Sequence, residues 1–375
     1  MRILFTGGGT GGHFYPIIAV AEAIHDLVRE RKLVEPDLLY AAPEPYDREM
    51  LYANNVRFVP TAAGKLRRYF SLLNVLDYFK TGWGVLTSVL RIFFLYPDVV
   101  FGKGGYASFP TLLAAKLFRI PVVIHESDAE PGRVNRWAGG FAQKIAVSYP
   151  EAAAFFPKER VAFTGNPVRK AALVPAREGA LEFFKFTPEM PVIFVTGGSQ
   201  GAQALNDAII SALPRLIEKY QIIHQTGEDN LEDIKGRARV ALGDSLNAER
   251  YKPLGYLNDL QMRMAAGAAN LVISRGGSTI FEIASWGTPS IIVPLPGAAE
   301  DHQTKNAYAY ARAGGCQVLE QQNLTPGLLG AEVDRILGNE QLRHAMMNGA
   351  RSFARADAAR IIAEALIDIA LSHEE

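Results

Sequence analysis

The sequence predicts an α/β fold made of two doubly wound halves, each a parallel sheet wrapped by helices. Short runs of β-branched and aliphatic residues alternate with helical patterns, which is typical of parallel strands joined by crossover helices. This order starts again after Pro188. A length of 375 residues also indicates two domains, at roughly 100–200 residues per domain.

The strands of the two halves are expected at these runs, and a linker lies between them. Thr164–Pro188 mixes prolines and charges with a short helical pattern, so we expect the linker there. The pattern of the last segment, Pro326–Leu371, predicts helix throughout, and the last helix could pack on either half. The expected strands are Ile3–Thr6, Leu38–Ala41, Val56–Val59, Val99–Phe101, Val122–Ile124 and Ile145–Val147, then Val192–Thr196, Ile222–Gln225, Leu271–Ser274, Ile291–Val293 and Gln317–Leu319.

The composition is that of a folded protein with no global charge. Apolar residues make up 49% and charged residues 21%, which disfavours disorder and a polytopic membrane protein. Basic and acidic residues number 39 each, so no overall field recruits nucleic acid. Cys316 is the only cysteine and the first five residues lack the apolar core of a signal peptide, which predicts a cytoplasmic location. The apolar stretch Trp83–Tyr96 is too short to cross a bilayer and contains Arg91.

Three glycine-rich turns follow expected strands and precede helices: Gly7–His13, Thr196–Ala202 and Ser274–Thr279. Glycines let the backbone approach a ligand, and a helix start offers free amides and a positive dipole end. Pro16 suits the first turn of the helix after Gly7–His13 because it lacks an amide proton. Glycine is also common in ordinary βα turns, but three such turns at the carboxyl ends of strands favour a phosphorylated ligand.

The first turn also satisfies Gly-x-Gly-x-x-Gly, which leaves a dinucleotide site open. That interpretation needs an acidic residue at the end of the second strand, and the nearest candidate, Glu44, lies beyond Pro43. An NAD-dependent oxidoreductase is therefore the less favoured alternative, from a different functional class.

Several polar residues near these turns have a functional and a structural interpretation. His13 could take a proton from a substrate or serve only as a cap, and the titratable cluster His125–Asp128 could act in catalysis or support loops. Glu282 could accept two hydrogen bonds from a ribose diol, or lie on a solvated helix face. Arg169 could pair with a diphosphate, or form a surface salt bridge. No cluster has metal-ligand spacing, so we predict no metal site.

A basic and aromatic stretch runs from Lys65 to Arg91. It contains five basic residues against one acidic residue, and its apolar side chains recur at helical spacing. Such an element could touch an anionic bilayer. On the pattern alone, a helix that buries its apolar stripe in the domain core is the favoured alternative.

Seven short motifs occur in a fixed order between residues 8 and 307. As an ordered set they closely resemble the MurG family, the N-acetylglucosaminyltransferases that add the second sugar to the lipid-linked precursor of bacterial peptidoglycan. The motifs are Gly8–His13, Gly102–Tyr106, His125-Glu126 with Pro131-Gly132 and Asn135-Arg136, Gly165–Arg169, Gly197–Gly201, Ser274–Glu282, and His302-Gln303 with Asn306-Ala307.

The resemblance implies a GT-B fold of two Rossmann-like domains. Residues 1–165, joined by a terminal helix at about 350–375, would face the acceptor and the membrane, and residues 166–349 would bind UDP-GlcNAc. The implied reaction is transfer of GlcNAc, with inversion, to the C4 hydroxyl of undecaprenyl-diphospho-MurNAc-pentapeptide, at the cytoplasmic face of the cell membrane. No cofactor is implied. A transferase of the same fold with another lipid acceptor, and a UDP-GlcNAc 2-epimerase, remain as alternatives.

The resemblance also implies roles for particular residues. By similarity, Glu282 binds the ribose and Leu257 lies near uracil, while Asp128 and Gln303 face the donor sugar. We hypothesise that His13 is the general base, with Glu126 and Asp128 as the other candidates. The diphosphate would be surrounded by Arg169, Ser199, Gly277, Ser278 and Thr279, and Thr10, Gly11 and Gly12 would close the cleft. The implied membrane contacts are Lys65, Arg68, Tyr69, Leu72, Leu73, Leu76, Phe79 and Trp83.

Overall fold

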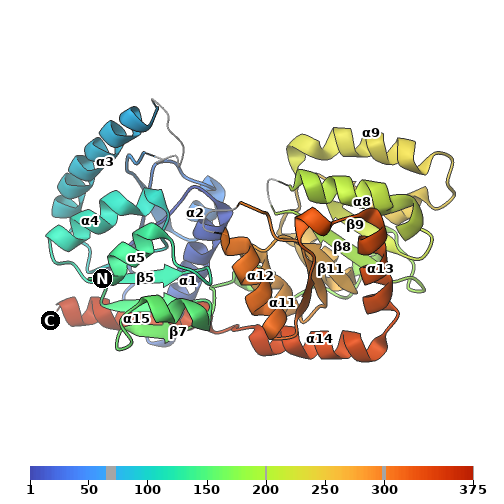
Figure 1. Ribbon diagram of the computed structural model, residues 1–375. Helices are drawn as coiled ribbons and strands as arrows, with labels where there is room; N and C mark the ends of the chain where they lie inside the picture. Colours follow the sequence, from blue (N-terminus) through green and yellow to red (C-terminus); the bar gives the residue numbers. More distant parts are fainter. Residues whose placement is uncertain (65–72, 199–200, 298–300, 375) are drawn as a thin grey trace. The chain divides into compact units, whose positions relative to one another are not determined.

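The chain folds into two compact units, each built on one parallel sheet (Figure 1). The computed structural model describes residues 1–64, 73–198, 201–297 and 301–374, of which 73–78, 373 and 374 are described by their backbone only. The first unit comprises Met1–Arg169 and Arg355–Glu375, and the second comprises Lys170–Ala354. The chain first passes between units at Arg169–Lys170, inside the segment expected to be the linker.

In the first sheet the strand order reverses between β1 and β4, and a glycine-containing turn follows each of these two strands. The full order is β3-β2-β1-β4-β5-β6-β7, and every pair is parallel. Because β1 has β2 on one side and β4 on the other, the switch point lies at the carboxyl ends of β1 and β4, which is where ligands of such sheets bind. The strands are β1 (Arg2–Thr6), β2 (Asp37–Ala42), β3 (Val56–Pro60), β4 (Val99–Gly102), β5 (Val122–Glu126), β6 (Lys144–Val147) and β7 (Val161–Phe163).

The helices of the first unit include the last helix of the chain. Helix α15 packs on α1, where Ile362 and Leu366 join Ile17 and Ile24 in one buried cluster. The first and last helices of the chain therefore share the core of the first unit. The helices are α1 (Gly11–Glu30), α2 (Arg48–Ala53), α3 (Leu73–Leu95), α4 (Phe109–Leu117), α5 (Arg133–Gly139) and α15 (Ala358–Glu374), with 3-10 turns η1 (Tyr106–Ser108) and η2 (Pro150–Phe155).

The second sheet repeats this arrangement. Its order is β10-β9-β8-β11-β12-β13, again entirely parallel, so its switch point lies between β8 and β11. The second glycine turn follows β8 and the third follows β11. The strands are β8 (Val192–Thr196), β9 (Gln221–Gln225), β10 (Tyr251–Leu254), β11 (Leu271–Ser274), β12 (Ser290–Ile292) and β13 (Cys316–Val318).

Helices cover both faces of the second sheet, each over its own apolar cluster. One cluster joins α8, α9 and α13 to the sheet, and the other joins α7, α10, α11 and α12 to it. The helices are α6 (Lys170–Leu173), α7 (Ala180–Phe184), α8 (Gln203–Leu216), α9 (Leu231–Leu242), α10 (Asp259–Ala268), α11 (Thr279–Trp286), α12 (His302–Arg312), α13 (Pro326–Leu337) and α14 (Glu340–Phe353), with 3-10 turns η3 (Glu228–Asn230), η4 (Ala248–Arg250) and η6 (Gln321–Asn323).

The structure confirms the predicted α/β class and each predicted strand, and it corrects three details. Strands β7 and β10 were not predicted; both lie at a sheet edge, and β10 contains Pro253. Helix α1 begins at Gly11, so Pro16 lies inside the helix rather than in its first turn. The terminal segment that was expected to be helical throughout is three helices, separated at Gly338 and at Ala354–Asp357.

Candidate active site

The first glycine turn brings Thr10 and His13 together at the carboxyl edge of the first sheet. Thr10 is extended and immediately precedes α1, but its side chain does not cap the helix. Instead, Thr10 Oγ1 lies 3.0 Å from His13 Nδ1. The ring of His13 also lies against the turn after β4, since a Cβ added to Gly105 would be 3.5 Å from His13 Nε2. His13 is half-buried.

Glu126 ends β5 at this edge and holds the loop that follows it. Its carboxylate accepts hydrogen bonds from Asp128 N at 2.9 Å, Gly132 N at 3.2 Å and Asn135 Nδ2 at 2.9 Å. Burial, with a further contribution from Asp128, raises the pKa of Glu126, although these hydrogen bonds oppose the shift. Glu126 is only 4% exposed, whereas Asp128 is half-buried and sits on the loop that Glu126 fixes.

Lys103 is a buried cation that the residue patterns alone did not single out. It follows β4, is 1% exposed, and its ammonium group donates a hydrogen bond to Ser127 Oγ. Ser127 Oγ in turn donates to Asn166 Oδ1 at 3.3 Å. Burial lowers the pKa of Lys103, while the nearby carboxylates of Glu126 and Asp128 favour its charge. A lysine between glycines usually lies in solvent, so its burial could only be found from the fold.

His125 supports the loops around this edge. Its Nε2 lies 3.1 Å from Gly165 O and 3.2 Å from Ser148 Oγ, and the side chain is fully buried. Burial, together with the charge of Lys103, holds the pKa of His125 well below its usual range. His125 is therefore neutral at physiological pH, and the structure supports the loop-supporting interpretation for this residue.

In the second unit, the turn after β8 is shaped by two glycines with left-handed backbones. Gly198 has φ 86° and Gly201 has φ 73°, conformations that other residues rarely adopt. Gly198 N donates to Thr196 Oγ1 at 3.3 Å, and Thr196 Oγ1 donates to Gln225 Oε1 at 2.6 Å. Ser199, expected at the diphosphate, lies outside the described residues.

The turn after β11 has an open face at the start of α11. Nothing lies within 4 Å of a Cβ added to Gly277, whereas one added to Gly276 would be 2.3 Å from Gln303 O. Ser278 and Thr279 are at the amino end of α11, where free amides and the helix dipole favour an anion. Glu282 is half-buried in the first turn of the same helix.

Two further side chains tie the start of α12 to this turn. Gln303 Oε1 accepts a hydrogen bond from Leu295 N at 3.0 Å, and Asn306 Nδ2 donates to Gly276 O at 3.2 Å.

Arg275, another residue that sequence analysis missed, is 8% exposed and donates to Val293 O at 3.1 Å. Burial lowers its pKa from the ordinary arginine value. The turn thus has a buried positive charge next to open backbone.

Two expected ligand contacts have other neighbours in the structure. Leu257 is 3% exposed and packs in an apolar cluster, so its side chain belongs to the core of the second unit. Arg169 lies in the first unit, with its guanidinium carbon 4.7 Å from the ring centre of Tyr15 on α1. A cation over an aromatic face is a stabilising contact in its own right.

The predicted site residues therefore form one group in each unit. Those of the first unit lie at the carboxyl edge of its sheet, and those of the second unit follow β10 or β11 or lie at the start of α12. Within the parts of the chain that the structure describes, no three His, Cys, Asp or Glu side chains are arranged to hold a metal ion. The first group is Thr10, Gly11, Gly12, His13, Glu126, Asp128 and Arg169, and the second is Leu257, Gly277, Ser278, Thr279, Glu282 and Gln303.

Comparison with known proteins assigns the chain to a family. Residues 3–147 match the glycosyltransferase family 28 N-terminal domain, and residues 192–362 match the family 28 C-terminal domain. A Treponema denticola protein named UDP-N-acetylglucosamine--N-acetylmuramyl-(pentapeptide) pyrophosphoryl-undecaprenol N-acetylglucosamine transferase is 35% identical, over 100% of this chain and 99% of its own length. A Syntrophotalea carbinolica protein of the same name is 38% identical over 96% of each chain. This chain belongs to the MurG family.

Solved structures agree with this family membership. The crystal structure of Acinetobacter baumannii MurG superposes with a TM-score of 0.72 at 28% identity, covering 98% of this chain and 99% of that one. The S. aureus MnaA–UDP co-structure has a TM-score of 0.71 at 17% identity, covering 100% and 98%, which shows a shared fold alone. The fold of this MurG-family chain is GT-B, and the chain is a glycosyltransferase of family 28.

Proposed function

We propose that this chain transfers GlcNAc from UDP-GlcNAc to the C4 hydroxyl of undecaprenyl-diphospho-MurNAc-pentapeptide, with inversion at the anomeric carbon. The observation that carries the proposal is the placement of glycine turns at the switch point of both sheets. It is made in a chain that matches, over nearly its full length, the N-acetylglucosamine transferases described above. Ligands of such sheets bind at the carboxyl ends of the strands, where the order reverses.

The donor is assigned to the second unit. The open backbone at Gly277 and the amide-rich start of α11 suit a diphosphate, and the buried guanidinium of Arg275 adds positive charge nearby. Glu282, one turn into α11, is suited to accept hydrogen bonds from a ribose diol. Arg169 and Ser199 stay proposed diphosphate contacts, and Asp128 and Gln303 stay proposed contacts of the donor sugar.

Inversion requires a single displacement. The acceptor O4 attacks the anomeric carbon from the face opposite UDP, the bond from that carbon to the diphosphate oxygen breaks, and the hydroxyl proton passes to a base. His13 is our proposed base. When its Nδ1–H donates to Thr10 Oγ1, the proton-accepting nitrogen is Nε2. Glu126 is less suited than Asp128 as an alternative, because three hydrogen bonds occupy its carboxylate.

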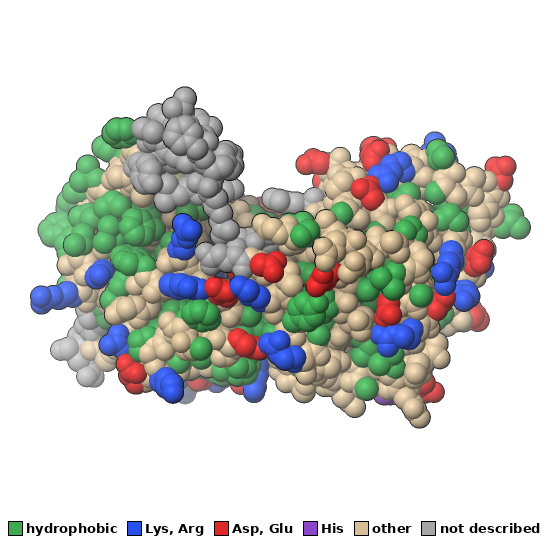
Figure 2. All heavy atoms as spheres, viewed as in Figure 1, with side chains coloured by type: hydrophobic (Ala, Val, Ile, Leu, Met, Phe, Trp, Pro, Cys, Tyr) green, Lys and Arg blue, Asp and Glu red, His purple; other side chains and the backbone are tan. Residues whose placement is uncertain are grey.

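A lipid-linked acceptor requires the enzyme to work at a membrane surface, and α3 offers a surface for peripheral attachment. Phe79, Trp83, Leu86, Leu90 and Phe94 recur along one side of this helix and are 74%, 63%, 51%, 53% and 80% exposed. Figure 2 shows hydrophobic side chains gathered over this region. The exposed side chains of Phe79 and Trp83 contradict the alternative in which they are buried in a core.

The same surface has exposed basic residues nearby, namely Lys80 on α3 and Lys116 and Arg119 at the end of the neighbouring α4. We therefore propose that it docks on the anionic lipid of the cytoplasmic leaflet. No helix in the described ranges is long and apolar enough to pass through a bilayer. Of the expected contacts, Lys65, Arg68, Tyr69 and Leu72 lie outside the described residues, and Leu73 and Leu76 are described by backbone only.

The proposed function is tested by following UDP release from UDP-GlcNAc with three acceptor conditions: the muramoyl lipid, diacylglycerol, and none. We expect release only with the muramoyl lipid. Release with diacylglycerol alone would identify a different lipid acceptor. Conversion of UDP-GlcNAc to its 2-epimer without any acceptor would replace the transferase proposal by an epimerase.

A further inference from the structure

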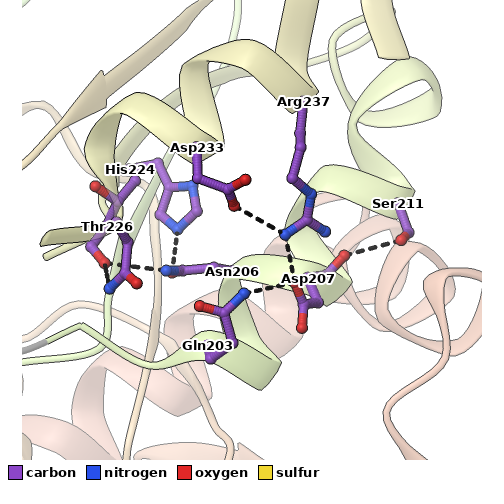
Figure 3. A network of polar contacts seen from close by, with 9 residues as sticks. Gln203, Asn206, Asp207, Ser211, His224, Thr226, Asp233 and Arg237 are labelled. Carbon is purple, nitrogen blue, oxygen red and sulfur yellow. Dashed lines mark hydrogen bonds and ion pairs between the residues drawn. The ribbon is translucent and has the colours of Figure 1, made fainter. Parts of the chain in front are cut away.

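A chain of buried hydrogen bonds runs through the second unit beside the turn that follows β8 (Figure 3). It starts at Tyr251 on β10, passes through His224 on β9 and Asn206 on α8, and ends at the backbone carbonyl of Thr226. His224, Asn206 and Thr226 are each 0% exposed. None of these residues was predicted to belong to the site.

The donor and acceptor of each hydrogen bond in this network follow from the bond between Asn206 and Thr226 O. Asn206 Nδ2 donates to Thr226 O at 3.0 Å, so Asn206 Oδ1 is the acceptor on its other side. His224 Nε2 therefore carries a proton and donates to Asn206 Oδ1 at 3.0 Å. The other nitrogen, Nδ1, then accepts from Tyr251 O–H at 2.8 Å. Burial lowers the pKa of His224 to about 3, so this neutral tautomer is kept at physiological pH.

The carbonyl at the end of the chain lies directly against the glycine turn. A Cβ added to Gly201 would be 2.0 Å from Thr226 O, so only glycine allows this approach. Asn230 Nδ2 donates to the same oxygen at 3.0 Å, and Gly201 N donates to Gly198 O at 3.0 Å. Thr226 O therefore packs against Gly201, two residues before α8 begins.

We propose that His224 and Asn206 are positioning residues for the donor diphosphate: they hold the Thr226 carbonyl in place, and that carbonyl fixes the position of Gly201, next to the start of α8 where the ligand would bind. The inference rests on the proposed function, because it assigns the turn to UDP. Neither side chain touches the ligand. Their contribution is to fix Gly201 and the start of α8 before binding, so that less free energy is lost on ordering these residues when the ligand binds.

Two kinds of variant separate positioning from general stability. Asn206→Asp keeps the size of the side chain but replaces the donor to Thr226 O with an oxygen that repels it. His224→Leu removes the donor to Asn206, whereas His224→Gln keeps an N–H group near the position of Nε2. The control is Gln221→Leu, because Gln221 is buried at the amino end of the same strand and bonds Thr187 and Met190, away from the turn.

The measurement is the Kd for UDP of each full-length variant by calorimetry, beside its thermal unfolding midpoint. We expect Asn206→Asp and His224→Leu to raise the Kd by about tenfold or more, His224→Gln to restore most of the loss, and Gln221→Leu to lower the midpoint with an unchanged Kd. An unchanged Kd in Asn206→Asp and His224→Leu, or an equal rise in Gln221→Leu, overturns the inference. If Asn206→Asp does not fold, the two His224 variants decide. A wild-type protein that does not bind UDP overturns the proposed function itself.

Discussion

His13 sits at the end of the first glycine turn, where its ring contacts Thr10 and lies beside Gly105. If it is the general base, His13→Ala should lower kcat by roughly a hundredfold or more, since proton removal then falls to water. Steady-state kinetics with saturating UDP-GlcNAc and muramoyl lipid give this value. His25→Ala is the matched control, because His25 is on the same helix but bonds Glu35 and Asn54 instead. A His13→Ala enzyme with near-normal kcat would remove His13 from the role.

Glu126 should make the folded protein less stable as the pH rises. Burial raises its folded pKa from 4.5 to about 7, so the folded state binds a proton more tightly than the unfolded chain does. Relative to Glu126→Gln, the wild-type free energy of unfolding should be greatest below pH 4.5 and fall as the pH rises to about 7. Urea unfolding across this range measures the difference. Altered hydrogen bonds in Glu126→Gln shift the difference in unfolding free energy by a constant amount, so only its change with pH reports on the pKa. Parallel curves for the two proteins would contradict the raised pKa.

Motif spacing predicted the glycine turns but not the individual side chains that support them. His13 and Glu282 could be named because they border glycine-rich turns that follow strands. Lys103 and His224 could not, because their roles depend on burial and on partners from other strands, such as Ser127 and Tyr251. Leu257 shows the opposite case: its position was implied by resemblance, but only the structure shows that its side chain belongs to the core.

Helix α15 joins the first unit through an apolar face against α1. Leu366 is fully buried in this contact, so Leu366→Ala should lower the free energy of unfolding by about 2–5 kcal/mol through lost burial and a cavity. Ile361, on the same helix, is 40% exposed, and Ile361→Ala should cost far less. Chemical unfolding of both variants tests this. Equal losses would mean that the helix does not pack as the structure shows.

Helix α3 should bind vesicles but contribute little to the stability of the folded protein. Trp83 and Phe94 are 63% and 80% exposed, so Trp83→Glu and Phe94→Glu should weaken binding to vesicles that contain anionic phospholipid, with little change in unfolding temperature. Vesicle co-sedimentation at low and moderate salt measures the effect. Leu246→Glu, at a fully exposed position in the second unit, should bind vesicles like the wild type. Wild-type binding by both α3 variants would exclude this helix as the docking surface.

The elements differ in how far the sequence determines them. The inner strands read as continuous apolar runs because both faces of a parallel sheet are covered. Strands β7 and β10 lie at sheet edges, where Phe163 is 39% exposed and Pro253 interrupts the pattern, so the apolar signal is weak. The long helical pattern near the end did not reveal its divisions, because the signals are short. Gly338 follows α13, the side chain of Asn339 caps α14, and Ala354–Asp357 separate α14 from α15.

For the whole molecule, ligand-linked stability separates the transferase from the oxidoreductase alternative that the first glycine turn left open. UDP should raise the unfolding temperature, and NAD should not, because only a ligand of the native state adds stability. At a UDP concentration of about a hundred times its Kd, the added stability is about 2.7 kcal/mol. Differential scanning fluorimetry with each nucleotide makes the comparison. Stabilisation by NAD alone would reverse the assignment.

A transfer assay with UDP-GlcNAc labelled in the sugar tests the proposed function most directly. The purified full-length chain is mixed with the donor and undecaprenyl-diphospho-MurNAc-pentapeptide, and the lipid fraction is extracted and its new linkage determined. We expect label in the lipid, joined β-1,4 to the muramoyl residue, with one UDP released for each sugar transferred. A lipid fraction without label, or labelled sugar joined through an α linkage, would contradict it.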